Sequence, residues 1–141
     1  MRSLIVGGTS GLGLEIAKLL QSSGDEVIIT GRKNPEIKGL QFQKFNLDLG
    51  AELSGAVDTF VSALPKIDRL FYVAGFYQEG NLTELEDQAI KNMLDVGINA
   101  PIWFARELLQ TQHEIPEFVA VTSTTSHIPR EREIIYSAVK A

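Results

Sequence analysis

The sequence of 141 residues contains no cysteine and only two histidines, His113 and His127, which lie apart along the chain. The absence of cysteine excludes disulfide bonds, thiolate metal sites and a cysteine nucleophile. Two separated histidines make no convincing metal site, so we expect no metal ion. The 13 Lys and Arg residues form no basic cluster and the net charge is −5. This charge pattern argues against nucleic acid as a partner.

Long apolar runs are also missing, since none approaches the roughly 20 residues that a bilayer-spanning helix needs. The first apolar segment begins by about Ser3, so we expect no signal peptide before it. A hydrophobic content of 44% with 22% charged residues is ordinary for a globular protein. We therefore expect one cytoplasmic domain over residues 1–141, with no membrane partner.

What the sequence does contain is an alternation of strand-like and helix-like segments. β-Branched or alternating apolar residues predict strands, and apolar residues at helical spacing predict helices between them. This order indicates an α/β fold of βαβ units, with a doubly wound (Rossmann) parallel sheet flanked by helices. Five strands are visible, over residues 4–6, 27–30, 40–45, 69–73 and 117–122.

Two helix boundaries carry specific signals. Thr83 with Glu86 three residues later has the pattern of a capping box, which predicts a helix that starts there and runs to about Val96. Asn99-Ala100-Pro101 then predicts a break or kink before a helix over residues 102–110.

The turn after the first strand is rich in glycine and is followed directly by an amphipathic segment. Strand, glycine turn and helix form the context in which such a pattern indicates dinucleotide binding. Gly7 permits the tight turn, Gly11 leaves room for a pyrophosphate near the helix start, and Gly13 lets helix and strand pack closely. A glycine-rich linker is the alternative interpretation, but linkers lack these flanking elements.

The turn after the second strand favours NADP over NAD as cofactor. A site for NAD usually has Asp or Glu here, about 20 residues beyond the glycines, to bind the ribose 2′-hydroxyl. This sequence has Gly31 and Arg32 instead. Arg32 can pair with a 2′-phosphate through its planar guanidinium, although a solvated turn residue is the alternative.

Tyr136 and Lys140 lie four residues apart, so on a helix their side chains share one face. An ammonium beside a phenol stabilises the phenolate, and such a pair can give a proton to a carbonyl oxygen as hydride reaches its carbon. Ser123, 13 residues before Tyr136, is placed after the fifth strand and could hydrogen-bond the same oxygen. Alone, this spacing is common by chance on surface helices.

Taken together, these motifs resemble the short-chain dehydrogenase/reductase family over residues 2–141. The stretch from Val6 to Gly13 is similar to the family's T-G-x-x-x-G-x-G pattern, except for Val6 at the threonine. Asp48-Leu49 is similar to its adenine-contacting pair, and Pro65-Lys66-Ile67-Asp68 to its G-K-I-D. The resemblance implies that Tyr136 is the acid/base, that Lys140 binds the nicotinamide ribose, and that Ser123 orients the carbonyl. The cofactor-binding residues that we expect are Gly7, Thr9, Ser10, Gly11, Leu12, Gly13, Arg32, Asp48, Leu49, Ala74, Gly75, Tyr136 and Lys140.

The sequence departs from the family pattern at two internal places. Tyr72-Val73-Ala74-Gly75 stands where the family has N-N-A-G, so two asparagine side chains are lost. Gly97 stands where the family has an asparagine that holds a water in its proton relay. Asn99 is the nearby residue that could substitute.

A third departure is the ending, one residue after Lys140, whereas family members continue well beyond this motif. We expect the C-terminal part of the family fold to be missing, because the chain is a fragment of a longer enzyme; a short form completed by a partner chain is the alternative. The leading hypothesis is an NADP(H)-dependent oxidoreductase that interconverts a carbonyl and an alcohol of a small-molecule substrate by hydride transfer, as a homodimer or homotetramer. The competing hypothesis is a non-catalytic NADP(H)-binding regulatory or interaction module.

Overall fold

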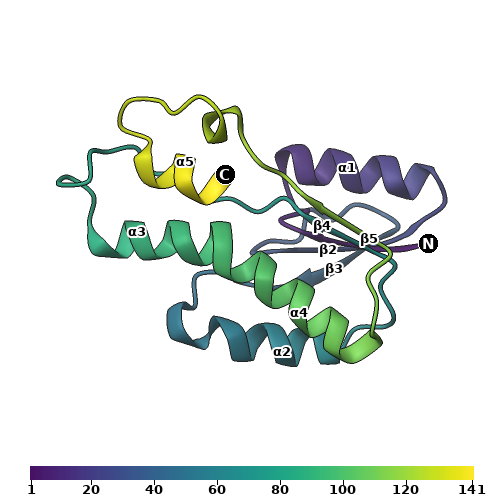
Figure 1. Cartoon of the computed structure of the whole chain (residues 1–141). Helices are drawn as coiled ribbons and strands as arrows, with labels where there is room; N and C mark the ends of the chain where they lie inside the picture. The colour runs from purple at the N-terminus through teal and green to yellow at the C-terminus, as the bar shows by residue number, and fades with distance from the viewer.

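The computed structural model describes residues 1–141 as a parallel sheet between two layers of helices (Figure 1). All strand pairings are parallel and the strand order is β3-β2-β1-β4-β5. The chain therefore winds outward from β1 in both directions, which confirms the predicted doubly wound sheet. The strands are β1 (Arg2–Val6), β2 (Glu26–Gly31), β3 (Leu40–Lys44), β4 (Arg69–Tyr72) and β5 (Glu117–Ala120).

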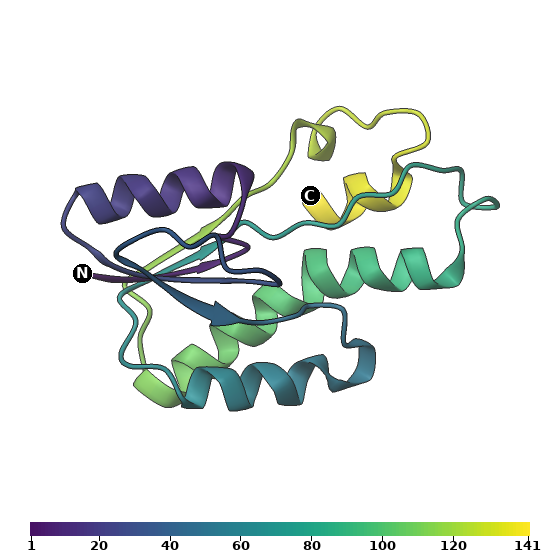
Figure 2. The same ribbon diagram turned by 180° about the vertical axis from the view of Figure 1, so that it is seen from behind.

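Helix α1 covers one face of the sheet, and α2 and α4 cover the other (Figure 2). Helix α5 lies beside α3, away from the sheet layers, in both views. None of these helices combines the length and the apolar character that crossing a membrane requires. The α-helices are α1 (Gly11–Ser22), α2 (Leu53–Ser62), α3 (Asp87–Leu94), α4 (Ala100–Gln112) and α5 (Ile134–Lys140), with short 3-10 helices at Gly50–Glu52 and Thr124–Ser126.

The core follows from the alternation of side chains along the strands. On β1, Leu4 and Val6 point to the layer of α2 and α4, whereas Ile5 points to α1, and all three are fully buried. Phe104 of α4 is the centre of the larger core, with Phe45 and Phe60 at ring-centroid distances of 5.4 and 6.0 Å. This packing fixes the sheet against its helices and so fixes the loops at the carboxyl ends of the strands.

Helix α3 starts at Asp87, so the prediction of a capping box on Thr83 is wrong. The carboxylate of Glu84 accepts hydrogen bonds from both the backbone N–H and the side-chain amide of Asn81. Backbone N–H groups of Glu84 and Leu85 also donate to the carbonyl of Asn81. These bonds close a separate turn over residues 81–85, and the helix begins only after it.

Helices α3 and α4 are continuous where the sequence indicates a break or kink. A π-helical turn, Asp95–Asn99, joins them, and Pro101 lies in the first turn of α4. The proline ring cannot approach the carbonyl of the residue four positions earlier, which is Gly97. The wider π turn accommodates this conflict without ending the helix, and such turns are frequent at functional sites.

Candidate active site

The glycine turn after β1 brings three backbone segments into close contact. Gly7 has φ of +87°, and a Cβ atom there would lie 2.6 Å from the backbone nitrogen of Ala74, after β4. A Cβ atom on Gly13 would collide with the carbonyl oxygen of Gly7. Only glycine fits at these two positions, so β1, the turn and α1 pack as closely as a phosphate cradle requires.

The start of α1 has free hydrogen-bond donors. Ser10 is its N-cap residue but makes no side-chain capping bond, and no acidic residue lies in the first turn. The first N–H groups of the helix are therefore available to a ligand. They form the positive end of the helix dipole, which faces the turn. This arrangement fits the pyrophosphate of a dinucleotide.

A cleft of about 510 Å³ opens at the carboxyl ends of the strands, next to this turn. Gly11, Leu49 and Ser123 are the predicted site residues that do not line it. Leu49 packs against the larger hydrophobic core instead. The predicted residues that do line it are Gly7, Thr9, Ser10, Leu12, Gly13, Arg32, Asp48, Ala74, Gly75, Tyr136 and Lys140.

Lys140, at the end of α5, is 9% exposed and its ammonium donates a hydrogen bond of 3.0 Å to the carbonyl of Val121. This bond joins α5 to the segment after β5. Burial lowers the pKa of Lys140, because the charged form loses its hydration. A Cβ atom on Gly75 would lie 3.7 Å from the ammonium, so the residues after β4 border the same group.

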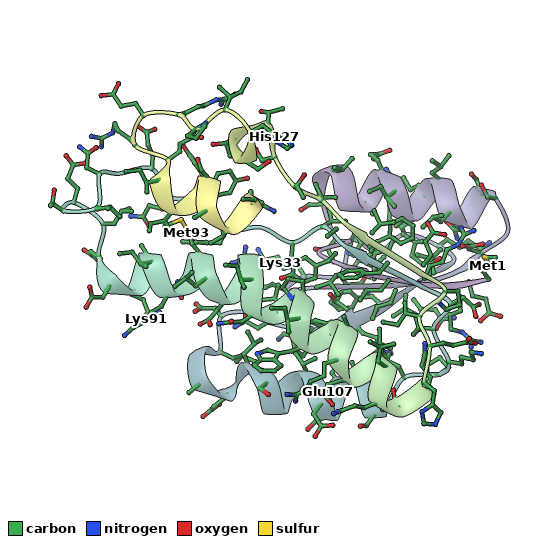
Figure 3. All side chains as sticks on the ribbon, viewed as in Figure 1. Met1, Lys33, Lys91, Met93, Glu107 and His127 are labelled. Carbon is green, nitrogen blue, oxygen red and sulfur yellow. The ribbon has the colours of Figure 1, made fainter.

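Tyr136 lies one helical turn before Lys140 and is half-buried. Its ring meets the ring of Tyr77 edge to face, with centroids 4.9 Å apart and an interplanar angle of 79°. Met93, labelled in Figure 3, is fully buried where α3 packs beside α5. The helix that carries Tyr136 is thus packed between α3 and the segment after β4.

Ser123 lies next to the cleft but outside its lining. It is the N-cap of the 3-10 helix Thr124–Ser126, and its hydroxyl oxygen accepts a hydrogen bond of 3.4 Å from the backbone N–H of Thr125. This bond uses a lone pair and leaves the hydroxyl proton free to donate. The structure therefore brings Tyr136 and Lys140 together in the cleft, with Ser123 at its border.

The profile of the short chain dehydrogenase family matches residues 2–141. The chain belongs to this family.

Curated relatives in the family share about a quarter of their residues with this chain. A 2-dehydro-3-deoxy-D-gluconate 5-dehydrogenase from Formosa agariphila is 24% identical over 98% of this chain and 58% of its own length. A 3-oxoacyl-[acyl-carrier-protein] reductase from Rickettsia felis is 26% identical over 99% of this chain and 60% of its own length. The chain thus spans less than two thirds of these short-chain dehydrogenases.

Solved structures show the same fold. Serine dehydrogenase from Escherichia coli superposes with a TM-score of 0.85 at 21% identity, covering 99% of this chain and 70% of that one. A 4-hydroxyisoleucine dehydrogenase complexed with NADH has a TM-score of 0.86 at 23% identity, with 99% and 63% coverage. These likenesses establish the fold of the short-chain dehydrogenase family for this chain.

Gly97, where the family pattern has asparagine, packs against Val139 of α5. A Cβ atom there would lie 2.8 Å from the Cβ atom of Val139, so no side chain fits without movement of α5. Asn99, the possible substitute, donates through its amide to the carboxylate of Asp95 at 2.8 Å and does not line the cleft. This member of the short-chain dehydrogenase family therefore has no asparagine amide from the π turn in the cleft.

Tyr72, at the first asparagine of the family's N-N-A-G, has a structural function in this chain. Its hydroxyl donates to the carbonyl oxygen of Val96, in the π turn immediately before Gly97. The ring is 3% exposed, and burial raises the pKa of Tyr72, which keeps the donor proton in place. This bond thus joins Tyr72 to the residue directly before Gly97, the other departure from the family pattern.

Sequence reasoning missed four polar residues that line the cleft. Asn46 had a usable signal, because it directly follows the third strand, two residues before Asp48. The sequence has no such signal at Asn92, because only the packing of α3 beside α5 directs this face of α3 toward the cleft. The four residues are Thr30, Asn46, Asn92 and Thr122.

Proposed function

We propose that the protein is an NADP(H)-dependent oxidoreductase that interconverts a carbonyl compound and an alcohol. The observation that carries this proposal is the cleft itself, which Tyr136 and Lys140 share with the glycine turn. A proton donor and a dinucleotide cradle then border one space. Membership of the short-chain dehydrogenase family and the dehydrogenase and reductase names of the relatives support the same activity.

The residues of the cleft fit a nicotinamide dinucleotide. The N–H groups at the start of α1 would hold the pyrophosphate, Asp48 the adenine side and Lys140 the nicotinamide ribose. When bound, this cofactor supplies or accepts the hydride. No side chain could occupy Gly7 or Gly13 without closing the cradle, which supports the assignment.

The side chains then handle the proton. During reduction the Tyr136 phenol gives its proton to the carbonyl oxygen, and during oxidation the phenolate takes a proton from the alcohol. The Lys140 ammonium stabilises the phenolate by its charge. Ser123 would orient the carbonyl through its free hydroxyl proton, provided that substrate reaches the border of the cleft.

Arg32 supports NADP as the preferred cofactor. It is exposed and lines the cleft at the carboxyl end of β2, and residues 31–33 include no carboxylate that would repel a 2′-phosphate. Solved family structures contain either nucleotide, since one serine dehydrogenase is complexed with NADP⁺ and 4-hydroxyisoleucine dehydrogenase with NADH. The positive charge of Arg32 is therefore the feature of this chain that favours NADP over NAD.

NADPH oxidation measured over a panel of ketones, aldehydes and quinones tests the proposed activity. We expect turnover with at least one compound, and we expect Tyr136→Phe to bind NADPH normally but to lose turnover. The matched control is Thr111→Val, which removes a hydroxyl that bonds only to backbone carbonyls of α4, outside the cleft lining. Equal activity of the parent and Tyr136→Phe would refute the assignment of the acid/base.

A non-catalytic NADP(H)-binding module is the second candidate. The absence of an asparagine side chain at Gly97 favours it, because the family's proton relay uses that residue. Calorimetry separates the two functions: tight NADPH binding with no turnover on any compound would establish the module.

We also propose that the protein acts in the cytoplasm as a homodimer or homotetramer. Helix α4 supports the assembly, because Ile102 and Leu109 are 54% and 48% exposed on it. Arg106 in addition lies over the ring of Trp103, 4.4 Å from its centroid. Light scattering of the parent and of Ile102→Glu would test this, and a monomeric parent would refute it.

A further inference from the structure

The carboxylate of Glu133 joins three parts of the chain beside Tyr136. One oxygen, Oε1, accepts a hydrogen bond of 3.1 Å from the hydroxyl of Tyr77, in the segment after β4. The other, Oε2, accepts one of 3.0 Å from the hydroxyl of Thr125, in the segment after β5. Glu133 itself is the residue immediately before α5, so these bonds connect both segments to the helix that carries Tyr136.

Glu133 is the N-cap residue of α5, but its side chain makes no capping bond to the first N–H groups of the helix. Its two carboxylate oxygens accept from Tyr77 and Thr125 instead. Helix α5 has seven residues, and helices of this length depend on tertiary contacts for their stability. The orientation of α5 is therefore set by bonds to neighbouring segments.

The direction of the hydrogen bonds can be assigned. A carboxylate only accepts, so the single hydroxyl proton of Thr125 is donated to Glu133. The hydroxyl oxygens of Thr125 and Ser137 are 2.6 Å apart, and Ser137 must therefore donate to Thr125. Thr125 is 1% exposed and Ser137 is 9% exposed, so water does not replace these partners. The ordered chain runs from Ser137 through Thr125 to Glu133.

This chain of hydrogen bonds surrounds Tyr136 on two sides. Ser137 directly follows Tyr136 in α5, so its bond to Thr125 fixes the helix backbone at the phenol. Tyr77, with its hydroxyl held by Glu133, packs its ring against the ring of Tyr136 at 4.9 Å. The same Thr125 donates its backbone N–H to the hydroxyl oxygen of Ser123. Both proposed catalytic hydroxyl groups are thus linked to one network.

A second connection holds the same two segments together. The guanidinium of Arg132 pairs with Glu79 at 3.0 Å and with Glu84 at 2.8 Å, and its backbone carbonyl accepts a hydrogen bond of 2.9 Å from the N–H of Gly80. These pairs are exposed and hold the outer ends of the segments. The buried Thr125 bonds lie closer to Tyr136 and carry the positioning.

We propose that Glu133 and Thr125 are positioning residues that hold the Tyr136 phenol in its working orientation in the cleft. The proposal rests on the proposed function, in which Tyr136 is the acid/base. Neither residue touches the cofactor cradle, because neither lines the cleft. Their loss therefore changes turnover and leaves NADPH binding unchanged.

The test compares Thr125→Val, which keeps the shape and removes the hydroxyl, with Thr125→Ser, which restores it. The matched control is Thr111→Val, since the Thr111 hydroxyl bonds only to backbone carbonyls of α4. We expect kcat of Thr125→Val to fall roughly tenfold to a hundredfold, as small misplacements of a catalytic group do. KM for NADPH is expected to stay constant, and Thr125→Ser and Thr111→Val to keep the parental kcat.

A structural readout keeps the test independent of turnover. The chain contains three tyrosines, so spectra of tyrosine-labelled protein are simple to assign. We expect a nuclear Overhauser effect between the rings of Tyr77 and Tyr136 in the parent and in Thr125→Ser, and its loss in Thr125→Val. If Thr125→Val does not fold, Glu133→Gln is the second variant, because the glutamine side chain has only one oxygen that can accept a hydrogen bond. We expect smaller losses of kcat and of the ring contact in this variant than in Thr125→Val.

Parental kcat and an intact ring contact in Thr125→Val would overturn the proposal. If Thr125→Val loses turnover but keeps the contact between the rings of Tyr77 and Tyr136, the proposal is overturned as well. If the parent has no turnover but the ring contact depends on Thr125, the positioning holds and the proposed function fails. The two failures are thus distinguishable.

Discussion

Replacing Gly97 by alanine tests directly whether α5 packs on the π turn as the structure shows. The added Cβ atom would lie 2.8 Å from the Cβ atom of Val139, about 1 Å closer than an ordinary carbon contact of 3.5–4.0 Å. Overpacking of this kind costs about 1–3 kcal/mol. Alanine also gains about 1 kcal/mol over glycine in helix propensity. We therefore expect Gly97→Ala to lower the free energy of unfolding by up to about 2 kcal/mol.

Gly55 in α2 offers a matched control for this change. It is exposed, and a Cβ atom there would meet nothing within 4 Å. Gly55→Ala should therefore raise the free energy of unfolding by about 1 kcal/mol, through propensity alone. Urea denaturation of both variants measures the difference. The packing of α5 against the π turn is contradicted if Gly97→Ala stabilises the protein as much as Gly55→Ala does.

The remaining predictions concern the charged groups of the cleft. Arg32→Ala should raise the Kd of NADPH roughly 10- to 100-fold, because it removes a charge-assisted hydrogen bond to the 2′-phosphate. The Kd of NADH should stay unchanged, and equal effects on both nucleotides would refute the phosphate contact. Burial lowers the pKa of Lys140, so the folded chain releases this proton at a lower pH than the unfolded chain does. The free energy of unfolding should therefore rise as pH climbs from the lowered pKa toward the ordinary value of 10.5. Denaturation of the parent and of Lys140→Met at pH 7 and pH 10 measures this rise. The free energy of unfolding should increase less between the two pH values in Lys140→Met than in the parent, and equal increases would contradict the prediction.

The sequence predicted the strands well, because β1, β2 and β4 contain short apolar runs that the structure buries, and β3 alternates apolar and polar residues. It misplaced the start of α3, since Thr83 and Glu86 match a capping box at the level of spacing. The choice between this box and the observed turn depends on Glu84, which binds Asn81 and also pairs with Arg132, 48 residues away in the chain. No local pattern contains that distant partner.

For the candidate site, most of the residues that the sequence by itself predicted do line the cleft, and the sequence also determined where the departures from the family pattern fall. These follow from local backbone needs, such as the close approach at Gly7 and Gly13, and from the rule that the carboxyl ends of parallel strands share one edge. Only the tertiary structure decided how the departures are accommodated. The hydroxyl of Tyr72 reaches the π turn beside Gly97, and Val139 fills the space of the missing side chain. The Glu133 network likewise depends on three segments distant in sequence, because hydrogen bonds of about 3 Å form only once the sheet has brought those segments together.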